Sequence, residues 1–202
     1  MKSKFITIEG CEGCGKSTQI QLLKEYFEKN SIPVVVTREP GGVPLAEKIR
    51  PLILDKSDTS VDPLAELMLF ASARAQHVSE FIKPALKSGK TVICDRFTDS
   101  TLAYQGYARG ISKRIIKTLN HIALDGLKVE LTILLDLPPK LAFERKKGFD
   151  VNDRMESETL KFHQKVYKGY KAIAAKEPDR MRTVDASGGI KEVFERILEL
   201  IK

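Results

Sequence analysis

Short apolar runs recur along the chain, and polar or glycine-containing segments separate them. Runs rich in Val, Ile and Leu predict five buried β-strands, at residues 5–8, 33–37, 91–95, 131–137 and 181–184. Most of these runs are continuously apolar and lack the alternation of a strand with one solvated face. Such strands are typical of a parallel sheet that is buried on both sides.

Helical patterns lie between these runs. Helices are predicted after residue 16, at residues 45–54, from residue 62 towards residue 86, and at residues 190–201. Pro51 is expected to kink the second helix or to divide it. Asp62 followed by Pro63 is a typical helix start. The alternation predicts an α/β fold, with a five-stranded parallel sheet and helices on both faces.

Residues 10–17 follow the first strand and match G-x-x-x-x-G-K-[ST], the phosphate loop (P-loop) of nucleotide-binding proteins. Its three glycines allow positive φ, so that consecutive backbone N–H groups can surround a phosphate chain. Lys16 would add a positive charge at the β- and γ-phosphates, and the Ser17 hydroxyl would ligate the magnesium ion of the nucleotide. The alternative is a glycine-rich turn, but the strand before it and the amphipathic helix after it favour the P-loop. The predicted phosphate-binding residues are Gly10, Cys11, Glu12, Gly13, Cys14, Gly15, Lys16, Ser17 and Thr18.

Length and charge narrow the class of protein. A chain of 202 residues with 42% hydrophobic residues fits a single domain over residues 1–202. The net charge of +7 suits anionic substrates. It would also suit nucleic acid, but no basic block or interleaved aromatic stripe supports that function, and no nucleic-acid partner is expected. No apolar run approaches the roughly 18 residues of a membrane span, and no signal-peptide core follows the N-terminus, so we expect a cytoplasmic protein with no membrane partner.

Cys11 and Cys14 form a C-x-x-C pair inside the P-loop. No second pair and no nearby histidines complete a four-ligand zinc site, and the odd total of three cysteines does not suggest a disulfide framework. We interpret both as filler at variable positions of the loop. A weaker hypothesis is that a disulfide between them would distort the loop and stop nucleotide binding.

Asp95 and Arg96 close the third strand, at the sheet edge where open α/β proteins bind ligands. Asp95 is placed to hold the magnesium shell opposite Ser17, the alternative being a helix-capping aspartate. Arg96 would project into the same cleft and grip a phosphate with two parallel N–H groups, although an isolated arginine is more often a surface residue.

Several motifs follow one another in an order that points to one family. They are TREPGG at residues 37–42, LFASAR at 69–74, DRFTDSTLAYQ at 95–105, LDLPP at 135–139 and DRME at 153–156. Together with the P-loop, they resemble the thymidylate kinases over nearly the whole chain. The resemblance implies a P-loop nucleoside monophosphate kinase fold, Mg²⁺–ATP as donor, dTMP as acceptor, and dTDP and ADP as products in dTTP biosynthesis. It also implies a homodimer.

The resemblance also assigns residues to the dTMP site. Phe70 would stack on thymine, and Arg74, one helical turn further on, would hydrogen-bond the base; otherwise they are a core aromatic and a surface arginine. Arg96 would hold the acceptor phosphate with Arg38 nearby. The expected dTMP-binding residues are Glu12, Arg38, Phe70, Arg74, Arg96, Thr101, Tyr104 and Gln105.

The variable positions of the P-loop contain no basic residue, although the transferring phosphoryl group needs a neutralising cation. The polar segment at residues 145–154 resembles the bacterial lid over ATP, which contributes an arginine. Lys147 stands where the usual arginine precedes the lid glycine, so Arg145 and Arg154 are the first candidates for the catalytic cation. The predicted catalytic residues are Lys16, Arg96, Arg145 and Arg154.

Other functions fit the sequence less well. A regulatory GTPase would share the P-loop, but no N-K-x-D guanine motif is present, and the one D-x-x-G, at Asp185, comes too late in the chain. A nucleic-acid-dependent ATPase and another nucleoside monophosphate kinase remain alternatives. Residues 185–188 follow the last strand, where the fold places its adenine-binding loop.

Overall fold

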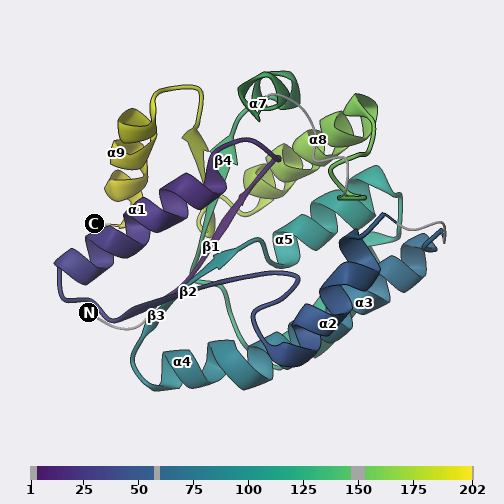
Figure 1. Ribbon diagram of the computed structural model, residues 1–202, viewed down its shortest axis with the longest axis horizontal. Coiled ribbons are helices and arrows are strands. Elements are labelled where there is room, and N and C mark those ends of the chain that lie inside the picture. Colours follow the sequence, from purple (N-terminus) through teal and green to yellow (C-terminus); the bar gives the residue numbers. More distant parts are fainter. Residues whose placement is uncertain (1–3, 57–59, 147–152, 202) are drawn as a thin grey trace.

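The computed structural model describes residues 4–56, 60–146 and 153–201. Five strands form one sheet in the order β2-β3-β1-β4-β5, and each neighbouring pair is parallel (Figure 1). The strands are β1 (Phe5–Gly10), β2 (Val34–Arg38), β3 (Thr91–Asp95), β4 (Leu131–Asp136) and β5 (Met181–Asp185). The predicted five-stranded parallel sheet is confirmed, with strand ends that differ from the predicted ones by at most two residues.

Helices connect the strands. Those in the described part of the chain are α1 (Lys16–Lys29), α2 (Pro44–Leu54), α3 (Pro63–His77), α4 (Lys83–Lys87), α5 (Thr98–Thr101), α6 (Lys113–Leu124), α7 (Pro139–Lys146), α8 (Leu160–Lys176) and α9 (Ile190–Ile201), with π-helical segments η1 (Val78–Ile82) and η2 (Leu102–Ala108). The Asp62 carboxylate caps α3 by accepting from the N–H of Leu64 at 2.8 Å, as predicted. No boundary falls at Pro51, because α2 runs through it as one helix.

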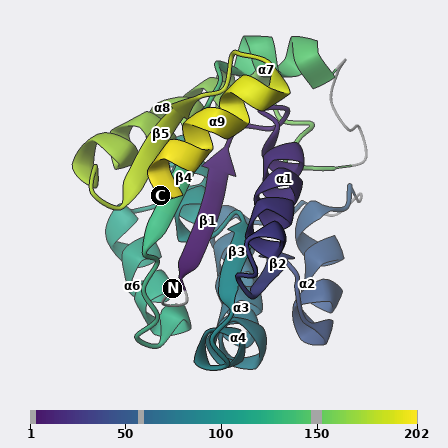
Figure 2. The same ribbon diagram turned by 90° about the vertical axis from the view of Figure 1, so that its left-hand side faces the viewer.

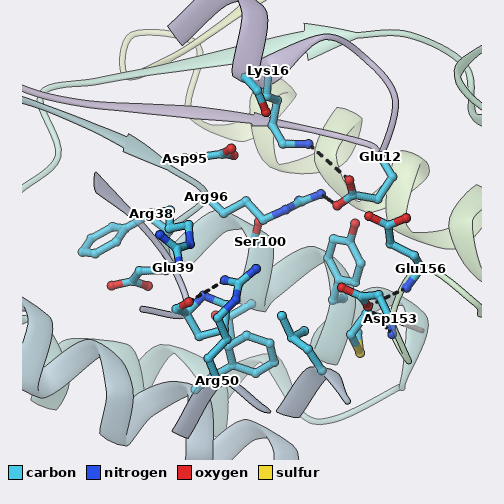
Figure 3. A pocket seen from close by; sticks show the side chains of 18 of the residues that line it. Glu12, Lys16, Arg38, Glu39, Arg50, Asp95, Arg96, Ser100, Asp153 and Glu156 are labelled. Atoms are coloured by element: carbon cyan, nitrogen blue, oxygen red, sulfur yellow. Dashed lines mark hydrogen bonds and ion pairs between the residues drawn. The ribbon is translucent and has the colours of Figure 1, made fainter. Parts of the chain in front are cut away.

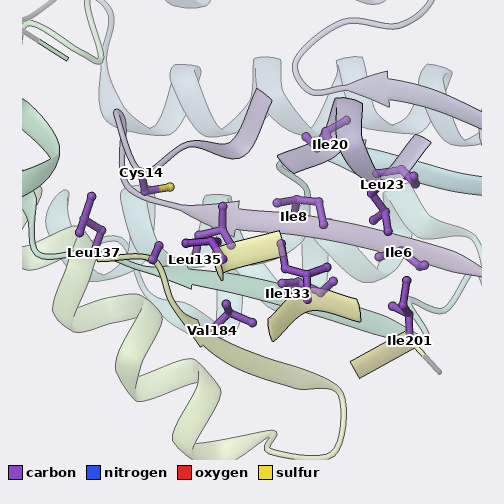
Figure 4. Close-up of a cluster of buried hydrophobic side chains, with 14 of the residues drawn as sticks. Ile6, Ile8, Cys14, Ile20, Leu23, Ile133, Leu135, Leu137, Val184 and Ile201 are labelled. Carbon is purple, nitrogen blue, oxygen red and sulfur yellow. The ribbon is translucent and has the colours of Figure 1, made fainter. Parts of the chain in front are cut away.

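The helices cover both faces of the sheet. On one face, α1 and α9 pack on β1, β4 and β5 and form the largest core (Figures 2 and 4). On the other face, η1 and α4 pack on β3 around Phe5 and Phe97, and η2 and α8 pack on β4 around Tyr170. This two-sided burial explains why the sequences of the three central strands β1, β3 and β4 are mostly apolar. The edge strands β2 and β5 are partly exposed.

The strand order brings three functional segments to one edge of the sheet. The P-loop leaves the carboxyl end of the central strand β1, and Ile8 of that strand pairs with Asp95 at the end of β3. On its other side, Asp95 pairs with Arg38 at the end of β2. The carboxyl ends of neighbouring parallel strands therefore build the site, as expected for an open α/β sheet.

Among the described helices, none is both long enough and apolar enough to cross a bilayer.

Candidate active site

The P-loop adopts the backbone that its glycines predict. Gly10, Gly13 and Gly15 have φ angles of 144°, 76° and 96°, values that other residues rarely adopt. Gly10 is also confined by space, because a Cβ there would lie 2.7 Å from the carbonyl oxygen of Leu135. The prediction of positive φ at these three positions is confirmed.

Lys16 begins α1 and folds back over the loop. Its Nζ donates to the carbonyl oxygen of Cys11 at 3.1 Å and lies 4.0 Å from a Glu12 carboxylate oxygen. Burial and Arg96 oppose the charged form of Lys16, but Glu12 and the other acidic neighbours outweigh them and leave its pKa above the usual value. The ammonium group is thus a fixed positive charge inside the loop.

The P-loop cysteines are free and buried. Burial, with Cys14 as neighbour, raises the pKa of Cys11 to about 12, and burial also raises the pKa of Cys14. Since the thiolate is the reactive form, neither thiol is activated for disulfide chemistry in this fold.

A cavity of about 540 Å³ opens at this edge of the sheet (Figure 3). It collects side chains from distant parts of the chain. Of the predicted site residues, it is lined by Glu12, Gly13, Gly15, Lys16, Ser17, Thr18, Arg38, Phe70, Arg74, Asp95, Arg96, Thr101, Tyr104, Gln105 and Arg145. Gly10, Cys11, Cys14 and Arg154 do not line it. The cavity is also lined by residues for which no role was predicted, namely Glu39, Pro40, Arg50, Leu54, Phe97, Ser100, Asp153, Met155 and Glu156.

Arg96 lies between the P-loop and the rest of the cavity. Its backbone is left-handed, with φ of 66°. One end of the guanidinium, Nη2, forms a close ion pair with Glu12 (Figure 3). The other end, Nη1, donates to the Tyr170 hydroxyl at 3.0 Å. Its carbon Cζ lies 5.2 Å from the centre of the Tyr104 ring. Arg96 is therefore held on three sides, with its charge in the cavity.

Glu9 supports Arg96 through contacts with the residues around it. This role was not predicted, because Glu9 lies between the predicted strand at residues 5–8 and the P-loop and belongs to neither pattern. Its Oε1 accepts from the N–H of Phe97 at 2.8 Å, and its Oε2 accepts from the Ser100 and Tyr170 hydroxyls at 2.6 and 2.8 Å. Burial, and then the nearby Asp99, raise the pKa of Glu9 to about 7. The carboxyl group thus fixes the backbone after Arg96 and also the two hydroxyls that contact its side chain.

α3 presents Phe70 and Arg74 to the other end of the cavity. Arg74 is 1% exposed, so it is neither a surface residue nor free to swing. Its Nε donates to Glu39 at 2.8 Å, and its Nη1 and Nη2 donate to Asn120 at 2.6 Å and Thr101 at 2.9 Å. This network orients the guanidinium beside Phe70, which is half-buried in the lining.

A buried chain of polar groups backs this network. The second Glu39 oxygen meets Nδ1 of His77 at 3.1 Å, and Nε2 of His77 meets the Thr37 hydroxyl at 2.7 Å. A Cβ at Gly42 would lie 2.5 Å from the Thr37 hydroxyl and 2.6 Å from the His77 ring. The glycine of the TREPGG motif is required here because a side chain would displace this support.

Two further arginines flank the cavity. Arg38 at the end of β2 is half exposed and pairs with Glu47 at 3.0 Å. Arg50 donates to the carbonyl oxygen of Pro40 at 2.6 Å, and burial together with Arg38 lowers its pKa. Arg50 and Leu54 are four positions apart and share one face of α2, a spacing that was available in the sequence but carried no functional motif.

η2 supplies the cavity wall opposite α3. The Tyr104 hydroxyl is buried and has no hydrogen-bond partner among the described residues. Gln105 is buried in the lining and donates from Nε2 to Glu66 at 2.7 Å. A buried hydroxyl without a partner beside a cavity is suited to meet a polar group of a ligand.

The oxygen atoms at the P-loop end fit a magnesium ion. Asp95 and Ser17 line the same cavity, and the buried Oδ1 of Asp95 has no hydrogen-bond partner in the described part of the chain. Carboxylate and hydroxyl oxygens are the hard ligands that Mg²⁺ prefers, usually with several waters retained.

The two lid arginines lie in different places. Arg145 at the end of α7 lines the cavity and donates to the carbonyl oxygens of Ala186 at 2.9 Å and Ser187 at 3.1 Å, in the loop after β5. Arg154 pairs with the buried Glu66 at 2.7 Å and donates to the Ile53 carbonyl, away from the cavity lining. Lys147 and the irregular stretch at residues 149–152 lie outside the described residues.

One cavity is lined by the P-loop, by an acidic residue at the end of the adjacent strand and by several arginines. Fold and site together define a P-loop kinase of nucleoside monophosphates. A family model for thymidylate kinase matches residues 8–197. The chain therefore belongs to the thymidylate kinase family.

Individual relatives support the same family assignment. The chain is 50% identical to the thymidylate kinase of Geotalea uraniireducens over 196 residues, which cover 93% of this chain and 91% of the relative. It is 49% identical to that of Synechococcus sp. JA-3-3Ab over 198 residues, covering 98% and 95%. A crystal structure of thymidylate kinase from Ehrlichia chaffeensis superimposes with a TM-score of 0.80 at 34% identity, over 100% of both chains. The chain is accordingly a nucleotide-biosynthetic kinase that phosphorylates dTMP with ATP in dTTP synthesis.

Proposed function

We propose that this single cavity carries out the whole transfer from ATP to dTMP, with the P-loop as the donor end and the α3–η2 pocket as the acceptor end. The observation that carries the proposal is the position of Arg96, which contacts Glu12 of the P-loop and also packs on Tyr104 of the acceptor pocket. One guanidinium group therefore lies where the two substrates must meet.

At the acceptor end, Phe70 stacks on the thymine ring, and Arg74 and Gln105 face its polar edge together with Thr101. Tyr104 lies against the sugar, where its hydroxyl finds the partner that it lacks inside the protein. Arg96 and Arg38 hold the 5′-phosphate, and Arg50 adds a third positive charge close to Arg38. A doubly charged phosphate is well matched by several guanidinium groups.

At the donor end, the backbone N–H groups of residues 10–18 surround the ATP phosphates, and Lys16 lies at the β- and γ-phosphates. Ser17 and Asp95 would hold Mg²⁺ directly or through water. A bound ion would supply positive charge that offsets the charge developing on the ATP phosphates.

The chemical step needs no protein nucleophile or base. A 5′-phosphate oxygen of dTMP, already largely ionised because its second pKa is about 6, attacks the γ-phosphorus of ATP. The bond from that phosphorus to the bridging oxygen breaks, and ADP leaves. Lys16, Arg96 and one lid cation neutralise the transferring group, while Glu12 faces the acceptor.

We assign the lid cation to Arg145 before Arg154. Arg145 lines the cavity and holds the loop after β5, where the adenine is expected, whereas Arg154 is engaged with Glu66 and Ile53. The lid is the segment at residues 145–154, in one domain that spans the chain. A location in the cytoplasm stays a prediction from the sequence.

We further propose a homodimer. Exposed apolar side chains occur in pairs seven or four positions apart, so that each pair shares one helix face. They are Leu45 and Leu52 on α2, Leu64 and Met68 on α3, and Ile115 and Ile122 on α6, with exposures of 42–66%. Exposed apolar clusters of this kind mark association surfaces.

An ADP-release assay with dTMP, dUMP, AMP, CMP and GMP, and with no acceptor, tests the proposal. We expect release that depends on an acceptor and is fastest with dTMP. Comparable ADP release without any acceptor would indicate an ATPase and overturn the proposal, and faster release with AMP, CMP or GMP would indicate another monophosphate kinase.

A further inference from the structure

Glu66 is a carboxylate buried in the wall behind the acceptor pocket. It lies on α3 with 0% exposure and does not line the cavity itself. Three donors from separate segments converge on it. They are Nε2 of Gln105 at 2.7 Å, Nη2 of Arg154 at 2.7 Å and Nη2 of Arg109 at 3.3 Å. A buried acid with this set of partners links the base pocket to the end of the lid.

The hydrogen-bond donors and acceptors around Glu66 determine the orientation of the Gln105 side-chain amide. A carboxylate that faces two guanidinium groups only accepts hydrogen bonds. The amide of Gln105 must therefore turn its NH₂ group toward Glu66, because its carbonyl oxygen in that place would meet the carboxylate with no hydrogen between them. The carbonyl Oε1 is then the part of the amide left for a ligand, and it has no hydrogen bond with any other described residue.

We propose that Glu66 is a positioning residue for base selection, which holds Gln105 so that an acceptor oxygen faces the base. Arg74 supplies donors to the same pocket, and its Nη2 contact with Thr101 fixes where those donors lie. A donor beside an acceptor complements the C4=O and N3–H groups of thymine or uracil. It opposes cytosine, which presents an amino group at C4 and a lone pair at N3. The inference rests on the proposed contact of Gln105 with the base.

The two arginines that pair with Glu66 are themselves held in place by other residues. Arg109 pairs with Glu158 at 2.5 Å and lies 4.7 Å from the centre of the Phe162 ring, so it is fixed independently of Glu66. Arg154 is fixed by the Ile53 carbonyl. Arg154 approaches the carboxylate at 2.7 Å and Arg109 only at 3.3 Å, so the pair with Arg154 fixes the carboxylate, which in turn holds the amide.

The test is base discrimination in Glu66→Gln, a change of nearly the same shape. A glutamine at this position can accept or donate, so Gln105 is free to turn over. We expect the ratio of the dissociation constants of dCMP and dTMP, measured by calorimetry, to fall by about tenfold or more. In steady-state kinetics, KM for dTMP should rise while kcat at saturating dTMP stays within about threefold.

The matched control is Arg109→Met, which removes another partner of the same carboxylate but leaves Gln105 in place. Its dCMP to dTMP ratio should stay within about twofold of the wild-type value. In a Gln105→Leu background, Glu66→Gln should no longer change the ratio. A purely structural role would weaken binding of both nucleotides equally in Glu66→Gln, and that result, or an equal fall in the ratio with Arg109→Met, would overturn the inference.

A measurement on the wild-type protein does not depend on folding of the variant. The side-chain amide protons of Gln105 should exchange with solvent more slowly than those of the exposed Gln164, as ¹⁵N NMR can detect. Equally fast exchange would contradict a fixed amide. A wild-type protein with no preference for dTMP over dCMP would instead contradict the proposed site, so the two failures are distinguishable.

Discussion

Arg96 shows how a single residue is placed for chemistry at a conformational cost. Its φ of 66° is a left-handed backbone, which costs a residue other than glycine roughly 1 kcal/mol. The N–H of Arg96 donates to the Ile8 carbonyl at 3.0 Å, and the following N–H donates to Glu9. These bonds hold the strained turn, so that the guanidinium leaves β3 towards the P-loop instead of following the strand.

Removing either fixed cation should stop transfer and leave the fold intact. We expect Lys16→Ala and Arg96→Ala each to lower kcat with ATP and dTMP by at least about a hundredfold, because each takes positive charge from the transferring phosphoryl group. Thermal unfolding followed by circular dichroism should remain cooperative. Near-normal turnover in either variant would refute the assigned mechanism.

Glu9 should make stability depend on pH near neutrality. Burial raises its pKa to about 7 from 4.5, so the folded protein holds a proton that the unfolded chain has lost. Its contribution to the free energy of unfolding therefore decreases as pH rises from about 4.5 to 7, by about 3 kcal/mol in all.

Urea unfolding of the wild type and of Glu9→Gln at pH 5, 6, 7 and 8 measures this effect. The wild type should lose stability relative to the variant as pH rises, since the variant has no carboxyl group to ionise. Parallel stability profiles for the two proteins would show that Glu9 does not titrate in this range.

At the scale of elements, the central strands were predictable because burial on both faces leaves a strong apolar pattern. The helix after the P-loop was predictable from the motif and from its single apolar face. The helices between residues 98 and 176 were not assigned from the sequence. The buried face of α8 includes His163 and Gly169 among its apolar residues, so hydrophobic periodicity is interrupted there. In α6 the apolar spacing of Ile116, Leu119 and Ala123 is regular, and this helix could have been predicted from the sequence. The helix predicted from residue 62 towards residue 86 corresponds to α3, η1 and α4, which follow one another directly.

The two lid arginines should have different effects, because they contact different elements. Arg145→Ala should lower kcat/KM for ATP by about 10- to 100-fold, since it removes a charge from the cavity and releases the loop after β5. Arg154→Ala should act mainly on stability, because it leaves the buried Glu66 with one guanidinium fewer.

Steady-state kinetics with varied ATP, together with thermal unfolding of both variants, separates these effects. A larger kinetic loss with Arg154→Ala than with Arg145→Ala would assign the catalytic cation to Arg154 instead.

At the scale of the whole molecule, much of the active site depends on contacts between distant parts of the sequence. Arg74 meets Glu39, Thr101 and Asn120, which lie 27 to 46 positions away. A motif can indicate that such a residue matters, but burial of a charge follows from partners that only the fold brings together. Glu9, Arg50 and Glu66 were missed for this reason.

The exposed apolar pairs on α2, α3 and α6 give a prediction about assembly. Met68→Glu should shift the protein towards monomer in sedimentation velocity, because a carboxylate would have to be buried at the interface. Ile190→Glu is the matched control, since Ile190 is 60% exposed at the start of α9. Equal sedimentation of both variants and the wild type would remove this face as the interface.

The arginines around the cavity are already occupied by the protein itself. Glu12, Glu47 and Glu39 pair with Arg96, Arg38 and Arg74, and the Pro40 carbonyl takes Arg50. A phosphate that binds therefore competes with these protein oxygens for the guanidinium groups, and the protein oxygens can take the place of a phosphate that leaves. This competition should weaken the binding of substrate and speed the release of product, which favours turnover over affinity.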